Sequence, residues 1–225
     1  MATVGGRGSG CPLNEGFPGV LQSEGLVTQS RQPARRFVAG PGGGSLERRA
    51  ASAMPDPLLA AVRTVPDFPT PGVAFRDLAP LLADPALARD VVERLAAPFL
   101  TAGVTTVAGL DARGFWFGPS LALRLGAGFV AMRKAGKLPR PVDGEAYALE
   151  YGAATLELAA GALGPGDRVL VHDDVLATGG TAAAAVALAR RAGAEVLAVT
   201  VVLELGALGG RARLPGVRVE AALAD

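Results

Sequence analysis

Residues 170–181 read LVHDDVLATGGT, a run of hydrophobic residues that ends in two carboxylates and continues into a turn of small residues. Carboxylates accept hydrogen bonds from neighbouring hydroxyls, whereas a small-residue turn that opens a helix offers free backbone N–H groups to phosphate. A ligand with both a diol and a phosphate, such as a sugar monophosphate, would explain this pairing. The alternative is a helix N-cap beside a solvated acid.

The turn has the composition of a phosphate cradle. Its two glycines let the backbone approach an anion closely, and its two threonines add hydroxyl donors. No lysine follows the turn, so it does not match GxxxxGK[ST] and nucleoside-triphosphate hydrolysis is not favoured. The residues that would hold the phosphate are Ala177, Thr178, Gly179, Gly180 and Thr181. Asp173 and Asp174 would then accept hydrogen bonds from the sugar hydroxyls.

Strands and helices alternate around this stretch. Apolar runs rich in valine and leucine predict strands, and two segments with helical patterning lie between them. Buried strands separated by helices indicate an α/β fold with a parallel β-sheet flanked by helices. Ligands of such sheets bind at the carboxyl ends of the strands, where the acidic pair lies. The expected strands are 105–110, 128–133, 168–174 and 195–205, and the expected helices are 116–126 and 179–193.

The other segments are less regular. A short helix should start near Asp56, and the Asp84-Pro85 pair should open a longer helix that Gly103 stops. Residues 68–82 are rich in Pro and Gly and should form a structured loop, while the C-terminal VRVEAALAD should form a last strand. Residues 134–152 are too polar and broken for a core element, so we expect a long loop there, of the functional or disordered kind.

The composition excludes several classes of protein. The net charge is +1, so no global basic field favours nucleic acid or an anionic membrane as a partner. Cys11 is the only cysteine, which excludes a disulfide framework and a cysteine zinc site and favours a reducing, cytoplasmic setting. Apolar runs are interrupted before ~18 residues, so no membrane span is expected. The first residues lack the order of a secretory signal.

Residues 1–53 differ from the remainder of the chain. They are rich in Gly, Ser and Arg without a sustained apolar period, so they cannot bury enough surface to offset their ordering entropy. We therefore expect a disordered N-terminal extension at 1–53 and one folded domain at 54–225.

The stretch VLVHDDVLATGGT resembles the 5-phosphoribosyl-1-diphosphate (PRPP) fingerprint of type I phosphoribosyltransferases. Together with PDFPTPGVAFRDLAPLL, GLDARGFWFGPSLA, RKAGKLPRPV and YALEYG, it makes residues 55–215 similar to the adenine phosphoribosyltransferase family. The resemblance implies the type I phosphoribosyltransferase fold, with a mobile catalytic loop and a small hood that covers the base. It implies purine salvage: adenine and PRPP would give AMP and diphosphate, with Mg²⁺ as cofactor, in a homodimer.

The resemblance also implies roles for individual residues. Asp173 and Asp174 would bind the ribose, and would reach the metal only indirectly, through PRPP and water. The 177–181 turn would bind the 5′-phosphate. Glu150 and Tyr151 would lie on the closing loop, with Glu150 handling the proton of the base. The diphosphate would be bound by Arg113, Arg133, Lys134 and Lys137, and adenine by Ala74, Phe75, Arg76 and Val175.

Other interpretations remain open. A PRPP-sensing regulator would be expected to add a helix-turn-helix or a basic face, and a sister enzyme would use another base. The AFRD and LEYG segments argue against both. The basic residues could form a solvated loop, and Phe75 could belong to the core. His172 stands where the family usually has an aliphatic residue. It could titrate near pH ~6.5, but we favour a strand residue satisfied by a neighbour.

Overall fold

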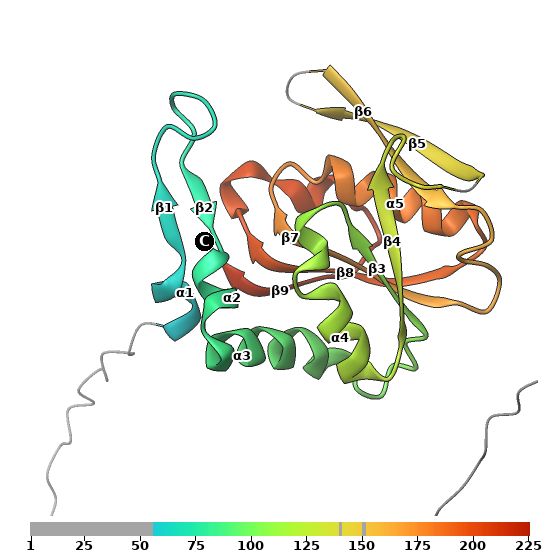
Figure 1. The fold of residues 1–225 in the computed structure, drawn as a ribbon, viewed down its shortest axis with the longest axis horizontal. Helices are drawn as coiled ribbons and strands as arrows, with labels where there is room; N and C mark the ends of the chain where they lie inside the picture. Colours follow the sequence, from blue (N-terminus) through green and yellow to red (C-terminus); the bar gives the residue numbers. More distant parts are fainter. Residues whose placement is uncertain (1–55, 140, 150–151) are drawn as a thin grey trace, which may run out of the picture. The chain divides into compact units, whose positions relative to one another are not determined.

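The computed structural model describes residues 56–139, 141–149 and 152–225. These residues form a seven-stranded sheet with helices on both faces, together with a small two-stranded sheet (Figure 1). The predicted 1–53 extension lies outside the described residues. The α/β prediction is confirmed.

The large sheet is mostly parallel. Its strands are β3 (Thr106–Leu110), β4 (Gly128–Lys134), β5 (Val142–Leu149), β6 (Gly152–Ala159), β7 (Arg168–Leu176), β8 (Glu195–Glu204) and β9 (Val219–Ala224). Their order is β5-β6-β4-β3-β7-β8-β9. Five neighbouring strands pair in parallel: β4, β3, β7, β8 and β9. Strand β6 pairs antiparallel with both β4 and β5. The sheet is therefore mixed, and the sequence prediction of a parallel sheet holds for its five central and C-terminal strands.

The antiparallel edge corrects a prediction. Residues 134–152 were expected to form a long loop, but β5 and the start of β6 occupy much of this segment. The polarity that argued against a core element has a physical reason: an edge hairpin has one face in solvent, so its residues alternate instead of forming a continuous apolar run. Leu156 and Leu158 are buried on its inner face.

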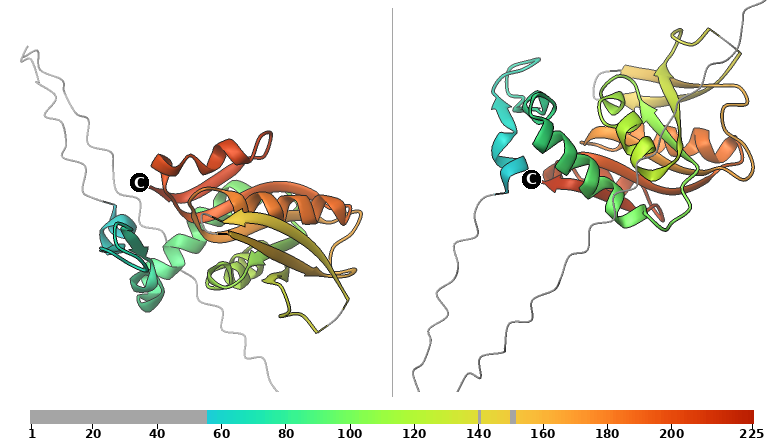
Figure 2. Two further views of the ribbon diagram at one scale, coloured as in Figure 1. Left: turned by 90° about the horizontal axis from the view of Figure 1, so that it is seen from above. Right: turned by 60° about the horizontal axis from the view of Figure 1, so that its bottom comes forward.

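Helices cover both faces of the sheet. Helix α5 (Gly180–Arg191) packs on one face against β5, β7 and β8, while α3 (Pro85–Ala96) and α4 (Gly118–Leu125) cover the other (Figure 2). Neighbouring residues of β7 divide between the two cores: Val169 and Val171 face α5, and Leu170 faces α3 and α4. This two-sided burial explains why the central strands read as continuous apolar runs.

The segment before α3 is built from short elements. It contains α1 (Pro57–Ala61), β1 (Arg63–Val65), β2 (Phe75–Asp77) and α2 (Ala79–Ala83). Asp56 caps α1 through the backbone N–H of Leu58, as its sequence position predicted. The 68–82 segment is only partly a loop, since β2 and most of α2 lie within it. Helix α3 ends at Ala96 instead of running to Gly103, because Pro98 follows and a short 3-10 turn, η1 (Ala97–Phe99), takes over.

Among the described residues, no helix is both long and apolar enough to cross a membrane.

Candidate active site

Polar side chains gather where β3, β4 and β7 end. These three strands are neighbours in the order β4-β3-β7 and run parallel, so their carboxyl ends lie at one edge of the sheet. Arg133 lies near the end of β4, and Arg113 follows β3 in the 3-10 turn η2 (Arg113–Phe115). The acidic pair lies near the end of β7. The sheet thus brings together residues that are up to 61 positions apart in the sequence, from Arg113 to Asp174.

The second carboxylate of the pair is buried but not fully used. Asp174 is 3% exposed, and its Oδ2 lies 3.0 Å from the Nε of Arg113. That is an ion-pair distance, yet the alignment is too poor for a hydrogen bond, and Oδ2 has no hydrogen-bond partner in the described part of the chain. A buried acceptor with unused capacity calls for a ligand that donates a hydrogen bond.

The first carboxylate is held in an environment that disfavours its charge. Burial raises the pKa of Asp173 well above its usual value, and the adjacent charge of Asp174 raises it further. The contribution of Asp173 to stability is thus complete below pH 3.8 and is lost as the pH rises through its raised pKa. A ligand that brings hydroxyl donors or positive charge would relieve this cost at neutral pH.

The turn after β7 presents free backbone donors. The first intrahelical bond of α5 runs from the N–H of Ala183 to the carbonyl of Gly179, at 2.9 Å. The three N–H groups before Ala183 therefore have no acceptor within the helix. Gly179 has φ = 80°, and a Cβ there would lie 2.4 Å from the carbonyl oxygen of Gly210, so this position requires glycine.

One small pocket joins the turn to Asp173, the first carboxylate of the acidic pair. It is lined by Asp173, Val175, Leu176, Ala177, Thr178, Gly179, Gly180, Thr181, Ala182 and Val201. The structure therefore brings the predicted phosphate turn, one of the predicted ribose carboxylates and the predicted base contact Val175 to one place.

Arg113 links the acidic pair to the small sheet. Its Nε lies beside Asp174, and its guanidinium carbon lies 5.3 Å from the centre of the Phe75 ring. Gly114 makes this approach possible, since a Cβ there would lie 2.5 Å from the carbonyl oxygen of His172. The turn η2 can therefore lie directly on β7, next to the carboxylates.

The residues predicted to contact adenine around β2 differ in what their side chains contact. Phe75 is half-buried and packs edge-on against Phe68, with 5.1 Å between the ring centres, and Ala74 before it is exposed. The side chain of Arg76 is engaged elsewhere: it contacts the carboxylate of Asp225 and donates to the hydroxyl of Thr64. Arg76 can thus offer a base its backbone groups, while its guanidinium is held by other partners.

Asp111 organises the basic residues and was not among the residues predicted from the sequence. Its side chain is 2% exposed, and its Oδ2 lies 3.3 Å from both the Nε of Arg133 and the Nζ of Lys137. The backbone N–H of Lys134 reaches the same oxygen at 3.4 Å. Burial alone would raise the pKa of Asp111, but the hydrogen bonds and charges of Lys137, Lys134 and Arg133 outweigh it and hold this pKa below its usual value. The signal was present, because LDARG puts this carboxylate at the end of a strand.

The family follows from comparison with known proteins. The model of the phosphoribosyl transferase domain matches residues 81–214. The chain is 55% identical over 160 residues to the adenine phosphoribosyltransferase of Thermobifida fusca, which covers 71% of this chain and 91% of that protein. The chain belongs to the adenine phosphoribosyltransferase family.

Solved structures of the family have the same fold. The adenine phosphoribosyltransferase of Rhodothermus marinus superposes with a TM-score of 0.72 at 50% identity, over 75% of this chain and 96% of that one. The enzyme of Giardia lamblia, solved as a complex with 9-deazaadenine, also has a TM-score of 0.72, at 41% identity over 75% of this chain and 96% of that one. The predicted membership of the phosphoribosyltransferase family is confirmed.

His172, where the resemblance implies an aliphatic residue, lies in the buried part of β7. It is fully buried, and its Nδ1 lies 3.0 Å from the hydroxyl oxygen of Thr200. Burial lowers the pKa of His172 to about 4, so the ring is neutral at neutral pH. The prediction of a strand residue satisfied by a neighbour is confirmed for Nδ1. Nε2 has no hydrogen-bond partner among the described residues.

The two residues predicted to be catalytic follow β5 in the chain. Glu150 and Tyr151 lie outside the described residues, between the end of β5 at Leu149 and the start of β6 at Gly152. Their assignment to a closing loop stays a prediction.

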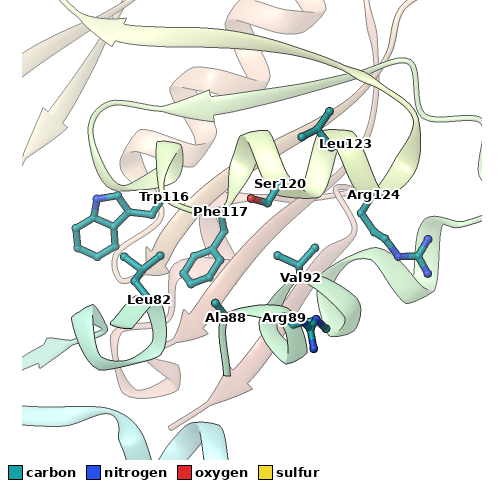
Figure 3. A pocket seen from close by; sticks show the side chains of 9 residues that line it. All are labelled: Leu82, Ala88, Arg89, Val92, Trp116, Phe117, Ser120, Leu123 and Arg124. Atoms are coloured by element: carbon teal, nitrogen blue, oxygen red, sulfur yellow. The ribbon is translucent and has the colours of Figure 1, made fainter. Parts of the chain in front are cut away.

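A larger hollow of about 470 Å³ shares no lining residue with the pocket at the turn, and Figure 3 shows the side chains that line it. Its lining comes from α2, α3 and the η2–α4 segment: Leu82, Ala88, Arg89, Val92, Trp116, Phe117, Ser120, Leu123 and Arg124. Trp116 is 38% exposed and Leu123 is 82% exposed. This hollow is larger than the pocket at the turn, but no carboxylate and no small-residue turn lines it. The larger hollow and the candidate active site are therefore different places on this protein.

Proposed function

We propose that this chain transfers the 5-phosphoribosyl group from PRPP to adenine, giving AMP and diphosphate, as an enzyme of purine salvage. The observation that carries the proposal is the pocket that Asp173 shares with the phosphate turn, with Arg113 between the carboxylate of the adjacent Asp174 and the ring of Phe75. Phosphate, ribose, diphosphate and base sites then follow one another around one strand end.

The turn binds the 5′-phosphate of PRPP. Its free backbone N–H groups and the hydroxyls of Thr178 and Thr181 surround the pocket at the start of α5, where the helix dipole also favours an anion. Asp173 and Asp174 accept hydrogen bonds from the ribose hydroxyls. Both carboxylates suit this role: one has an unused buried acceptor, and the other is stabilised by the donors that a diol brings.

Four basic residues, Arg113, Arg133, Lys134 and Lys137, bind the diphosphate. In the described structure Asp111 holds Arg133 and Lys137 together at the end of β4, close in the sheet to Arg113 after β3. Breaking the bond between ribose C1 and oxygen develops positive charge on the sugar and leaves a strongly anionic diphosphate. Fixed positive groups around that diphosphate stabilise the separating charge.

The donor set fits Mg²⁺. Among the described residues no cluster of three or more His, Cys, Asp or Glu could hold a metal on its own. The acidic pair supplies two carboxylates, and Mg²⁺ commonly binds through one or two carboxylates together with substrate phosphates and waters. Asp173 and Asp174 would thus hold the ion indirectly, through PRPP and water, and the ion would supply charge neutralisation for the leaving diphosphate.

The base lies between Phe75 and Val175, with Ala74 and the backbone of Arg76 beside it. Backbone carbonyls of this segment accept a hydrogen bond from the amino group of adenine but oppose the carbonyl oxygen of a 6-oxopurine. Because the guanidinium of Arg76 is engaged by Asp225 and Thr64, it is not free to donate to that oxygen. Mispairing a buried acceptor costs about 1–3 kcal/mol, so adenine is the preferred base.

Glu150 and Tyr151 close over the reacting centre. Exclusion of water matters here, because hydrolysis of PRPP would compete with transfer to the base. Glu150 takes the proton that the attacking nitrogen of adenine must lose. Resemblance to the family supports both roles.

The working form is a cytoplasmic homodimer. The hollow lined by α3 and α4 supports this assembly, because exposed Leu123 and Trp116 on α4 and its preceding turn form an apolar surface that a second copy would cover. No nucleic acid or membrane partner is implied by a chain with a net charge of +1.

The test mixes the protein with PRPP, Mg²⁺ and one purine at a time and follows nucleotide formation. We expect AMP from adenine, and a kcat/KM for hypoxanthine and guanine at least ~10-fold lower, on the energy range of one mispaired acceptor. Comparable kcat/KM for adenine and hypoxanthine at saturating PRPP would overturn the adenine assignment. No nucleotide from any base would overturn the transfer reaction.

A further inference from the structure

An ion pair joins the small sheet to the end of the large one. The guanidinium of Arg76, on β2, contacts the carboxylate of Asp225, which directly follows β9. The same guanidinium donates to the hydroxyl of Thr64 on β1, the residue paired with Arg76 in the small sheet. The side chains of Arg76 and Asp225 are 27% and 35% exposed, so this contact is partly shielded from solvent.

Asp225 is itself fixed to the large sheet. Its N–H donates to the carbonyl of Glu204 at 3.0 Å, and its own carbonyl accepts from the N–H of Gly206 at 3.2 Å. Glu204, in turn, is gripped by Arg211 through both carboxylate oxygens, at 2.6 and 2.7 Å. The carboxylate that meets Arg76 therefore projects from a backbone held on both sides. In the views of Figures 1 and 2, the C-terminal mark lies beside the cyan segment that carries α1 and the small sheet.

The small sheet needs such an anchor. It has two strands of three residues, and an isolated two-stranded sheet is marginally stable at best in water. Phe75 and Arg76 are adjacent on β2, so their side chains leave opposite faces of the strand. Phe75 lies against Arg113 at the acidic pair, while Arg76 is held by Asp225. The strand is thus positioned from both faces.

We propose that Asp225 is a positioning residue that fixes the base-covering strand β2 by holding Arg76. It acts through Arg76 and does not touch substrate. The proposal rests on the assignment of Phe75 to the adenine site. With the ion pair present, the ring of Phe75 stands at its working distance from the end of β7 before adenine arrives. Without it, adenine binding must also order β2, whereas the phosphate turn and the acidic pair on β7 are unaffected.

The consequence is a split between the two substrates. Replacing Asp225 by Asn removes the charge and keeps the shape of the side chain. We expect the KM for adenine, at saturating PRPP, to rise about threefold, within the range that partly exposed ion pairs give. The KM for PRPP, the kcat and the melting temperature should stay close to those of the wild type. A general loss of folding would move all four quantities together.

Matched variants make the test specific. Glu220→Gln is the control, because Glu220 lies on β9 and pairs with Arg218 at 2.7 Å instead of with the small sheet. Asp225→Glu should keep the KM for adenine near the wild-type value, since it restores the charge. Arg76→Gln should raise it as Asp225→Asn does, and the double variant should be no worse than either alone.

The outcomes separate this proposal from the proposed function. If the wild type forms AMP but Asp225→Asn leaves the KM for adenine unchanged, or raises both KM values equally, the positioning role is wrong. Additive effects of Asp225→Asn and Arg76→Gln would also contradict it. If the wild type forms no AMP, the proposed function itself fails, whatever the variants do.

Discussion

The two regions proposed to bind anions are built in different ways. The phosphate turn is one continuous stretch whose shape is set by backbone conformation, with Gly179 in the left-handed region and pressed against Gly210. The basic cluster consists of Arg133 near the end of β4 and Lys137 just after this strand. The side chain of Asp111, which follows β3, holds the two together. A backbone-built site should tolerate loss of charge but not added volume. A side-chain-built site should behave in the opposite way.

The largest effect is expected from added volume at the turn. In Gly179→Ala, the new methyl group would meet the carbonyl oxygen of Gly210 at 2.4 Å, on a backbone conformation that L-residues rarely adopt. A left-handed conformation alone costs about 1–2 kcal/mol, and displacement of the turn adds to it. We expect kcat/KM for PRPP to fall about 100-fold, equivalent to ~3 kcal/mol.

The control for this variant is Gly164→Ala. A Cβ at Gly164 has nothing within 4 Å, and its φ is outside the left-handed region, so its steady-state kinetics should match the wild type. Equal kinetics for Gly179→Ala and the wild type would show that backbone shape does not define the phosphate site.

A smaller effect is expected from loss of charge in the basic cluster. Asp111→Asn keeps the volume but leaves Arg133 and Lys137 without the carboxylate that holds them together. A charged hydrogen bond is worth about 1.5–3 kcal/mol, and partial exposure of both cations places the effect at the low end. Kinetics at varied PRPP should give a kcat/KM about 10-fold below the wild type.

Asp90→Asn provides the comparison, since it removes a carboxylate from a partly exposed pair with Arg94 within α3. Its kcat/KM for PRPP should be unchanged. If Asp111→Asn and Asp90→Asn gave the same value, Asp111 would have no role in organising the cluster.

The smallest effect on activity is expected behind the acidic pair, at His172. Its pKa of about 4 lies below 6.5, so its contribution to stability is complete above pH 6.5 and is lost as the pH falls through about 4. The difference corresponds to roughly 3 kcal/mol. Replacing His172 by Leu should leave turnover at neutral pH near the wild type.

Denaturant titrations between pH 7 and pH 4 measure this contribution. The wild type should lose more unfolding free energy across this range than His172→Leu does. Parallel losses in the two proteins would mean that His172 is not the group responsible.

The sequence predicted what is local. The stretch 168–181 contains the strand, the carboxylates and the turn in order, so alternation and composition were sufficient to place the carboxylates and the turn, which we propose bind ribose and phosphate, at one strand end. The core strands were equally clear, because burial on both faces leaves continuous apolar runs. The resemblance to the family added Arg113 to the predicted site, and the structure places this residue beside Asp174.

The features that the sequence did not predict depend on contacts between distant segments. The β5–β6 hairpin was missed because an edge strand with one solvated face has a weaker apolar signal than a central strand. Predicting the role of Asp111 would require the strand order, because this residue follows β3 and its partners lie near the end of the neighbouring strand β4 or just after it. The pairing of Arg76 with Asp225 joins residues 149 positions apart, and no local pattern predicts it.

The most direct test of the central claim is turnover at limiting PRPP by wild type and by Asp174→Asn. The substitution keeps the size of a buried side chain but removes the charged acceptor assigned to the ribose hydroxyls, an interaction worth about 1.5–3 kcal/mol. We predict a fall in kcat/KM for PRPP of about 10-fold or more, with an unchanged melting temperature. Unchanged turnover at limiting PRPP would contradict the ribose assignment and, with it, the placement of the active site at the end of β7.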